Sequence, residues 1–130
     1  MDVLLVHPGG PIWAKRDAGA WSIPKGEPET GEDPLTAARR EFAEELGSPA
    51  PDGELRDLGT VRSGRKVIAA FALAGDLNAD QIVSNTFELE WPPRSGRTQS
   101  FPEVDRAAWF DLDTARHKIV KSQRPFLDRI

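Results

Sequence analysis

Three glutamates stand close together on one predicted helix. Glu41, Glu44 and Glu45 occupy positions i, i+3 and i+4 of the segment 34–46. At about 100° per residue they share an arc of roughly 100°. Carboxylates this close repel one another, raise each other's pKa and weaken the helix. Their place near the carboxyl end adds to the cost, because the helix macrodipole disfavours anions there.

This acidic face has two interpretations. It is either a solvated side of an amphipathic helix, with Arg39 and Arg40 offsetting part of the repulsion, or a site for a hard divalent cation. Mg²⁺ and Mn²⁺ take carboxylate oxygens and leave coordination positions for water and phosphate oxygens. A bound cation would offset the repulsion, so the residues that precede the helix must decide between the two.

The ends of this helix are marked in the sequence. Asp33 suits the N-cap and Pro34 suits the first helical position. No further helix breaker occurs until Gly47, which suits a left-handed C-cap. The spacing also predicts one buried stripe on the helix. Its members are Leu35, Ala38, Phe42 and Leu46.

Other elements are expected on both sides of the helix. Apolar runs and alternation predict strands over residues 2–7, 21–23, 55–62, 66–73, 85–91 and 103–110. The run 66–73 is nearly all apolar, so we expect it to be buried on both faces. Asp113 is expected to cap a helix through Val120, and Ser122 to start a second helical turn through Ile130. The repeated tetrapeptide Arg-Ser-Gly-Arg, at 62–65 and 94–97, indicates two hairpin turns. This order predicts a mixed α/β sandwich.

Composition excludes several classes of protein. The chain has 130 residues, which predicts a single domain over 1–130. It has no Cys, and so no disulfide framework, thiolate zinc site or cysteine nucleophile. The net charge of −4 argues against a broad nucleic-acid surface. No apolar run reaches the roughly 20 residues of a membrane span, and no signal peptide opens the chain. We therefore expect a cytoplasmic protein.

The loop before the helix favours the cation site. The stretch 26–47 resembles the Nudix box, G-x5-E-x7-R-E-U-x-E-E-x-G-U, where U is bulky and apolar. Two packing positions depart from the pattern, Phe42 and Ser48. The lead-in Trp-Ser-Ile-Pro-Lys-Gly at 21–26 is similar to that of the branch containing dinucleoside polyphosphate hydrolases. All seven fixed residues of the box are present: Gly26, Glu32, Arg40, Glu41, Glu44, Glu45 and Gly47.

The resemblance implies a fold and an activity. The fold would be a Nudix-type α/β/α sandwich with a mixed β-sheet and a catalytic loop–helix–loop, lacking the family's usual first strand because the chain begins in the second. The activity would be metal-dependent hydrolysis of a phosphoanhydride bond in a nucleoside diphosphate linked to another group, such as a dinucleoside polyphosphate or a nucleoside triphosphate. The alternative is a non-catalytic Nudix-fold nucleotide sensor. A third reading is an isomerase or an RNA-decapping enzyme on the same scaffold.

The resemblance also assigns roles at the cation site. Glu41, Glu44, Glu45 and the carbonyl of Gly26 would bind Mg²⁺ or Mn²⁺. Arg40 would orient the glutamates by bidentate hydrogen bonds.

Further catalytic roles extend beyond the ligands. Glu32 would brace the loop by pairing with Arg40. Glu103 would be the general base or an outlying metal ligand, with Asp105 as its nearest rival. Because the family varies on this point, Glu44 and the other helix glutamates are also candidates for the base.

Fewer residues can be assigned to contacts with the substrate. Lys25 would point at a phosphate, and Arg97 would meet a distal phosphate. The base would stack on an aromatic ring, with Trp21, Trp91 and Phe87 as candidates. The expected partner is a small nucleotide, with no long nucleic acid and no membrane, and the protein would be a monomer or a homodimer.

Overall fold

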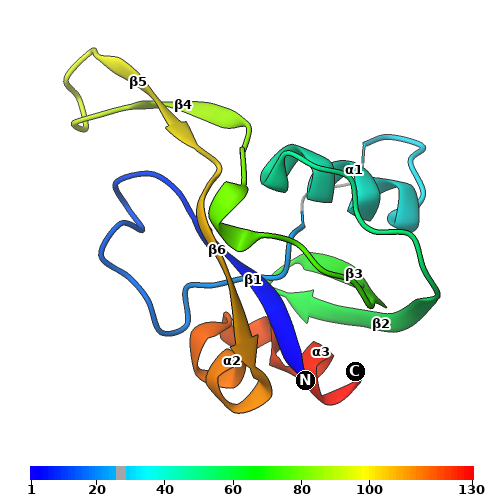
Figure 1. Ribbon diagram of the computed structural model, residues 1–130. Helices are drawn as coiled ribbons and strands as arrows, with labels where there is room; N and C mark the ends of the chain where they lie inside the picture. Colours follow the sequence, from blue (N-terminus) through cyan, green and yellow to red (C-terminus); the bar gives the residue numbers. More distant parts are fainter. Residues whose placement is uncertain (26–28) are drawn as a thin grey trace.

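The computed structural model describes residues 1–25 and 29–130. Within these ranges the chain forms three α-helices, two 3₁₀ turns and six β-strands (Figure 1). The strands are β1 Asp2–Pro8, β2 Leu55–Ser63, β3 Lys66–Leu73, β4 Thr86–Glu90, β5 Thr98–Pro102 and β6 Val104–Asp111. The helices are α1 Pro34–Leu46, α2 Leu112–Lys118 and α3 Arg124–Asp128, with 3₁₀ turns η1 Ala79–Gln81 and η2 Lys121–Gln123.

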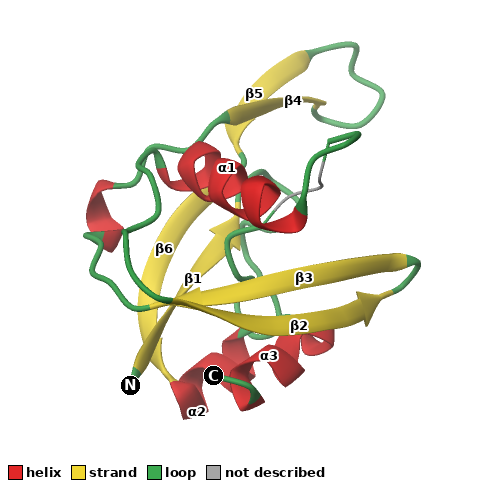
Figure 2. Cartoon of the chain, turned by 90° about the vertical axis from the view of Figure 1, so that its right-hand side faces the viewer, coloured by secondary structure: helices red, strands yellow, loops and turns green. Residues whose placement is uncertain are grey.

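The strands pair antiparallel in three small sheets. Strand β1 pairs with β6, β2 with β3, and β4 with β5. Helix α1 lies on one side of these strands and α2 and α3 lie on the other, while the β4–β5 hairpin projects from the body (Figure 2). Both Arg-Ser-Gly-Arg tetrapeptides fall at hairpin turns, as predicted, one between β2 and β3 and the other between β4 and β5.

Helix α1 has the predicted ends. The Asp33 carboxylate accepts the Thr36 N–H at 2.9 Å, which caps the first turn. Gly47 closes the helix at φ 77°, and a Cβ there would lie 2.5 Å from the carbonyl oxygen of Val83. Only glycine therefore fits this position, for both its backbone angle and its packing.

The buried face of α1 differs in part from the predicted stripe. The buried residues are Ala37, Glu45 and Leu46, with Phe42 partly buried beside them. Leu46 and Phe42 pack against Val6 of β1 and Val104 at the start of β6. A carboxylate, Glu45, is thus carried into the interface between the helix and these strands.

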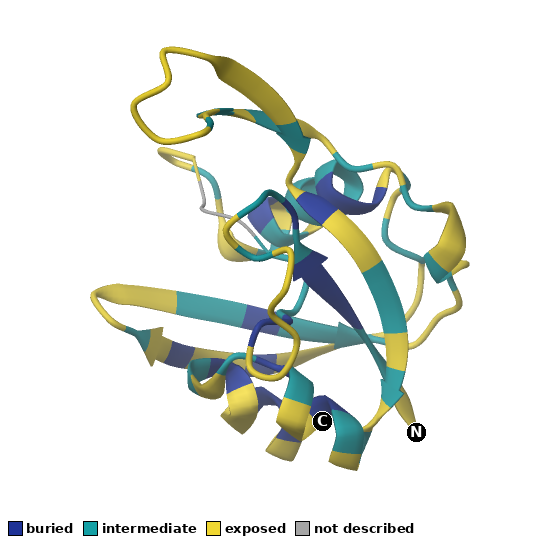
Figure 3. Ribbon diagram, turned by 90° about the vertical axis from the view of Figure 1, so that its left-hand side faces the viewer, coloured by how far each residue is buried: buried dark blue, intermediate teal, exposed yellow. Residues whose placement is uncertain are grey.

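The rest of the core forms two clusters in which the strands pack against the carboxyl-terminal segment. One cluster joins Leu5 of β1 to Ile119 and Leu127 near the carboxyl terminus, and a second joins β2 and β3 to Phe126. The buried positions concentrate on the inner strands and the inward faces of the helices (Figure 3). These clusters fix the strands that carry the loops of the site.

Three strand predictions need correction. Strand β5 was not predicted, because Thr98–Pro102 is mostly polar and exposed and forms a strand by pairing with β4, with Phe101 opposite Phe87. Strand β3 is not buried on both faces, since it pairs within the described residues only with β2 and leaves Val67 61% exposed. The segment 21–23 forms only isolated bridges, at Trp21 and Ser22, in place of a strand.

The start of α2 is also two residues earlier than predicted. Asp111 is the N-cap, and its carboxylate accepts the Thr114 N–H at 2.8 Å. Asp113 lies in the first turn instead. The helix ends at Lys118 because the next residues turn to pair with Trp21, whose carbonyl accepts the Val120 N–H at 2.7 Å.

Candidate active site

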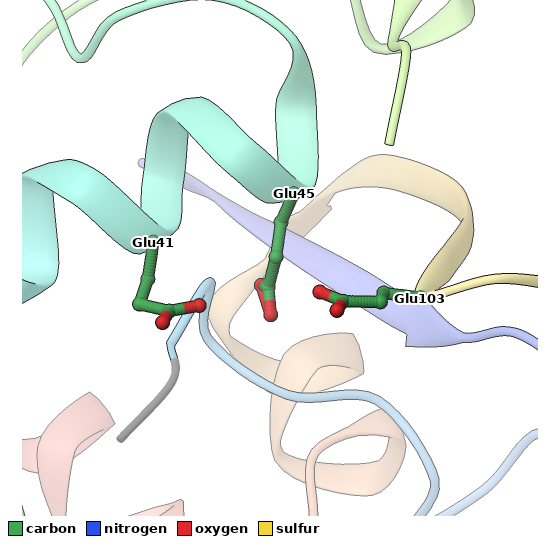
Figure 4. A group of neighbouring side chains, drawn as sticks. All are labelled: Glu41, Glu45 and Glu103. Carbon is green, nitrogen blue, oxygen red and sulfur yellow. The ribbon is translucent and has the colours of Figure 1, made fainter. Parts of the chain in front are cut away.

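Three carboxylates from two distant parts of the chain converge beside α1. Glu41 and Glu45 project from one face of the helix, and Glu103 comes from the residue before β6 (Figure 4). One oxygen from each lies within 4.8 Å of the others. Glu45 is buried, Glu41 is half-buried and Glu103 is exposed. The group therefore opens to solvent on the Glu103 side.

A chain of backbone hydrogen bonds sets the position of Glu103 relative to the helix. The Asn85 N–H donates to the Glu44 carbonyl at 2.9 Å, and the Asn85 carbonyl accepts the Glu103 N–H at 2.8 Å. The Glu103 carbonyl in turn accepts the Gly9 N–H at 2.9 Å. The last turn of α1, the strand β6 and the loop after β1 are thus tied together at the carboxylates.

Arg40 organises a second set of carboxylates on the outer side of α1. Its Nε and Nη2 donate to the two oxygens of Glu32, each at 2.9 Å, which is the pair that the sequence predicts. Its Nη1 donates to Glu41 at 2.7 Å and to Glu44 at 3.1 Å. Opposite charges compensate one another in this set. Hydrogen bonds from Arg40 lower the pKa of Glu32, and hydrogen bonds to Glu32 and Glu41 raise the pKa of Arg40.

In the converging group the carboxylate pKa values shift in the opposite direction, since those of Glu45 and Glu103 are raised. The pKa of Glu45 is raised to about 7, chiefly by burial and to a smaller extent by the charges of Glu41 and Glu103. The Lys25 N–H that donates to Glu45 at 3.2 Å and the charge of Lys25 act against the rise. Burial likewise raises the pKa of Glu103, with smaller contributions from Glu41 and Glu44. Arg40 pairs with Glu41 and the charge of Lys25 opposes the rise at Glu45, but Glu45 and Glu103 form no ion pair among the described residues and both keep a raised pKa.

The donor set suits a hard divalent cation. All three groups supply carboxylate oxygen, which Mg²⁺ and Mn²⁺ prefer. Opposite oxygens in an octahedral Mg²⁺ site lie about 4.2 Å apart, from bonds of about 2.1 Å. Neighbouring ligand oxygens in such a site lie closer, about 3.0 Å apart, so the three carboxylates, whose oxygens lie within 4.8 Å of one another, would draw together around an ion. A cation would also remove the repulsion that raises the pKa of Glu45.

Comparison with known proteins agrees with this geometry. The family model described as NUDIX domain matches residues 1–130. The chain belongs to the Nudix family. Among curated proteins, an RNA pyrophosphohydrolase from Rhodospirillum rubrum is 28% identical over 149 residues, covering 98% of this chain and 81% of that protein. As a Nudix hydrolase, the protein is a pyrophosphohydrolase that acts on phosphorus-containing acid anhydrides. No helix in the described part of the chain is long and apolar enough to cross a membrane.

The Nudix box residues divide between the two sets. Glu41 and Glu45 lie in the converging group, whereas the Glu44 carboxylate lies outside it and accepts from Arg40. Glu44 as a metal ligand stays a prediction. Gly26, also predicted as a ligand, lies outside the described residues.

The predicted substrate contacts are scattered. Trp21 is 4% exposed, with its ring edge-on to His7 and Phe110, and it lines a cavity of about 570 Å³ that none of the three converging carboxylates lines; its role in stacking a base stays a prediction. Arg97 is exposed at the turn of the β4–β5 hairpin. Lys25 adjoins the site through its backbone N–H on Glu45.

No role was predicted for the loop after β1, yet this loop reaches the site. Ile12 and Trp13 line a cavity of about 330 Å³ that also includes Glu103. The available signal was a pair of large apolar residues in a segment expected to be exposed; Ile12 is 57% exposed. A larger cavity of about 570 Å³ lies over β6, but none of the three converging carboxylates lines it.

Proposed function

We propose that this Nudix hydrolase cleaves a phosphoanhydride bond in a dinucleoside polyphosphate or a nucleoside triphosphate, with Mg²⁺ or Mn²⁺ as cofactor. The observation that carries the proposal is the convergence of Glu41, Glu45 and Glu103 within 4.8 Å, at an edge open to solvent. Nudix hydrolases generally depend on divalent metal ions, and this group can hold one. A polyphosphate brings several negative charges to an acidic protein, so it needs such a cation to bind.

The bound ion would neutralise phosphate charge and lower the pKa of water, which supplies a nucleophile near neutral pH. Glu41 and Glu45 would hold the ion from the helix. Glu103 would be either an outlying ligand or the general base; where it is not bound to the ion, its raised pKa suits it to accept a proton from the attacking water. Its exposure places that carboxylate where water and substrate arrive.

The neighbouring residues would position these groups. Arg40 holds Glu41 by a hydrogen bond and braces the preceding loop through Glu32. Glu44 would act as a further ligand or as an alternative base, beside Arg40. We keep Lys25 and Arg97 as phosphate contacts in this proposal, Lys25 because its backbone already adjoins Glu45.

Two other functions compete with this one. A non-catalytic nucleotide sensor is disfavoured because all seven fixed residues of the Nudix box are present. Removal of pyrophosphate from the 5′ end of an RNA is favoured by the name of the Rhodospirillum rubrum relative. The net charge of −4 argues against contacts along a long RNA, so we place small nucleotides first.

The proposal includes finer points of structure. We propose the α/β/α sandwich with a mixed sheet, without the family's usual first strand, as the architecture that carries the site. The protein would act as one domain, as a monomer or a homodimer. A cytoplasmic location stays a prediction.

A product assay with Mg²⁺ tests the function. Diadenosine tetraphosphate, ATP and a 5′-triphosphorylated oligoribonucleotide are compared as substrates, for the wild type and for Glu45→Gln. We expect phosphoanhydride cleavage of the small nucleotides by the wild type and loss of it in the variant. Preference for the oligoribonucleotide would move the assignment to RNA ends, and the absence of cleavage from every substrate would overturn the proposal.

A further inference from the structure

A cavity beside Glu103 lies between the loop after β1 and the strand β4. It has a volume of about 330 Å³, and its main lining side chains are Pro11, Ile12, Trp13, Phe87, Leu89 and Glu103. We call it the β4 pocket. Phe87 and Leu89 alternate with exposed residues along β4, so both face the loop from the same side of the strand. Glu103 belongs to this pocket and to the carboxylate group, which joins the two.

The walls of the pocket are held in place. The Gly9 N–H donates to the Glu103 carbonyl at 2.9 Å, and buried His7 anchors the far end of the loop by donating from Nε2 to the Arg16 carbonyl at 2.6 Å. A Cβ on Gly10 would lie 3.0 Å from the Phe87 ring, so the loop backbone rests against that ring. Gly10 has φ 95°, which favours glycine at this contact.

The chemistry of the lining selects the occupant. Its side chains are apolar or aromatic except for Glu103, which faces the carboxylate group. The charged phosphates of a substrate would lie at that group, and the pocket next to it would receive the flat, uncharged part. Stacking of a base on an aromatic side chain contributes about 1–3 kcal/mol by alanine substitution. The volume is at the low end of the roughly 300–1,000 Å³ typical of small-molecule sites, which suits one nucleoside.

The lining also sets what the pocket can distinguish. None of its nine described residues is Asn, Gln, Arg or Lys, so these side chains offer few hydrogen bonds to the edge of a base. Recognition of the base therefore depends mainly on the ring area available for stacking, which is larger for a purine than for a pyrimidine. We propose that the β4 pocket binds the purine ring of the substrate and selects by ring size, with adenine and guanine bound alike. The role in catalysis rests on the proposed hydrolysis of nucleotides, but binding of a purine does not.

Titration with adenosine, without phosphate or metal, tests the pocket apart from the chemistry. The readout is quenching of tryptophan fluorescence, with cytidine as the second probe and Trp13→Phe to assign the signal. We expect adenosine to bind more tightly than cytidine, and Phe87→Ala to weaken adenosine about tenfold, within the range for a lost stacking partner. The matched control is Trp109→Phe, an exposed aromatic outside the lining, which should bind like the wild type.

Phe87 also packs on Phe101, with ring centroids 6.1 Å apart, so its loss could disturb the hairpin. Phe87→Leu keeps an apolar side chain without an aromatic face and serves as the second variant, with circular dichroism to verify the fold. Equal binding of adenosine and cytidine, or adenosine binding unchanged in folded Phe87→Leu, overturns the pocket assignment.

In turnover assays we expect the same variant to raise KM for a purine nucleotide and leave kcat nearly unchanged. Hydrolysis with identical KM for purine and pyrimidine nucleotides would reject purine binding in the β4 pocket but leave the proposed hydrolysis standing. Adenosine binding without hydrolysis of any nucleotide would support the pocket and reject the proposed hydrolysis.

Discussion

Two sets of carboxylates flank the same helix and differ in how their charge is compensated. On the outer side, Glu32 and Glu44 accept hydrogen bonds from Arg40, and the pKa of Glu32 is lowered. On the inner side, Glu45 and Glu103 form no ion pair among the described residues, and both pKa values are raised, although Lys25 opposes the rise at Glu45 and Arg40 pairs with Glu41. Stability alone would favour the outer arrangement. We propose that the inner set receives a cation from solution and that Arg40 of the outer set holds Glu41 in place.

The largest expected effect comes from the inner set. Glu45→Gln keeps the size of the side chain and an oxygen to accept the Lys25 N–H, but removes an anionic ligand. We expect kcat/KM to fall on the order of 100-fold or more, because metal-ion stabilisation of the transition state is worth several kcal/mol. Steady-state hydrolysis with Mg²⁺ measures this. Glu88→Gln, an exposed change on β4, is the control, and similar rates for both variants would refute the division into two sets.

A smaller effect is expected from the outer set. Arg40→Lys keeps the charge but loses the bidentate pair with Glu32, so Glu41 and the preceding loop are held less firmly. We expect activity to fall about 10–100-fold, the usual cost of losing a residue that orients metal ligands. Arg39→Lys, on an exposed position of the same helix, should leave activity intact. If the two variants behave alike, Arg40 does not position the ligands.

The comparison also predicts a dependence of stability on pH without metal. The pKa of Glu45 rises from 4.5 to about 7 on folding, so its contribution is fully present below pH 4.5 and is lost as pH rises through 7. Glu45→Gln removes this loss. In urea unfolding at pH 8 without metal, the variant should be more stable than the wild type, by up to roughly 3 kcal/mol for the full shift. A variant that is no more stable than the wild type at pH 8 would show that Glu45 is not strained by its burial.

The parts of the molecule that sequence predicts best are local. The ends of α1 follow from Asp33 and Gly47, and the pair of Arg40 with Glu32 is what the resemblance to the Nudix box implies. Strand β5 and the exposure of β3 depend on pairing partners and on which faces are covered, which composition does not encode.

Long-range placement was harder to predict at the site as well. The resemblance to the Nudix family predicts that Glu103 lies with the helix glutamates, but the backbone hydrogen bonds through Asn85 and Gly9 that bring it there cannot be inferred from side-chain types. Trp21 and Trp13 show the same limit: both are tryptophans near the box, but tertiary packing buries Trp21 and leaves Trp13 lining the β4 pocket.

Direct measurement of bound Mn²⁺ tests whether the inner set binds a cation. Electron paramagnetic resonance of Mn²⁺ titrated into the wild type, Glu45→Gln and Glu88→Gln reports free and bound ion without any substrate. We expect the wild type and Glu88→Gln to bind Mn²⁺ with the same affinity, and Glu45→Gln to bind it at least about tenfold more weakly. Mn²⁺ binding that is the same in all three proteins would contradict the assignment of Glu41, Glu45 and Glu103 as the metal site.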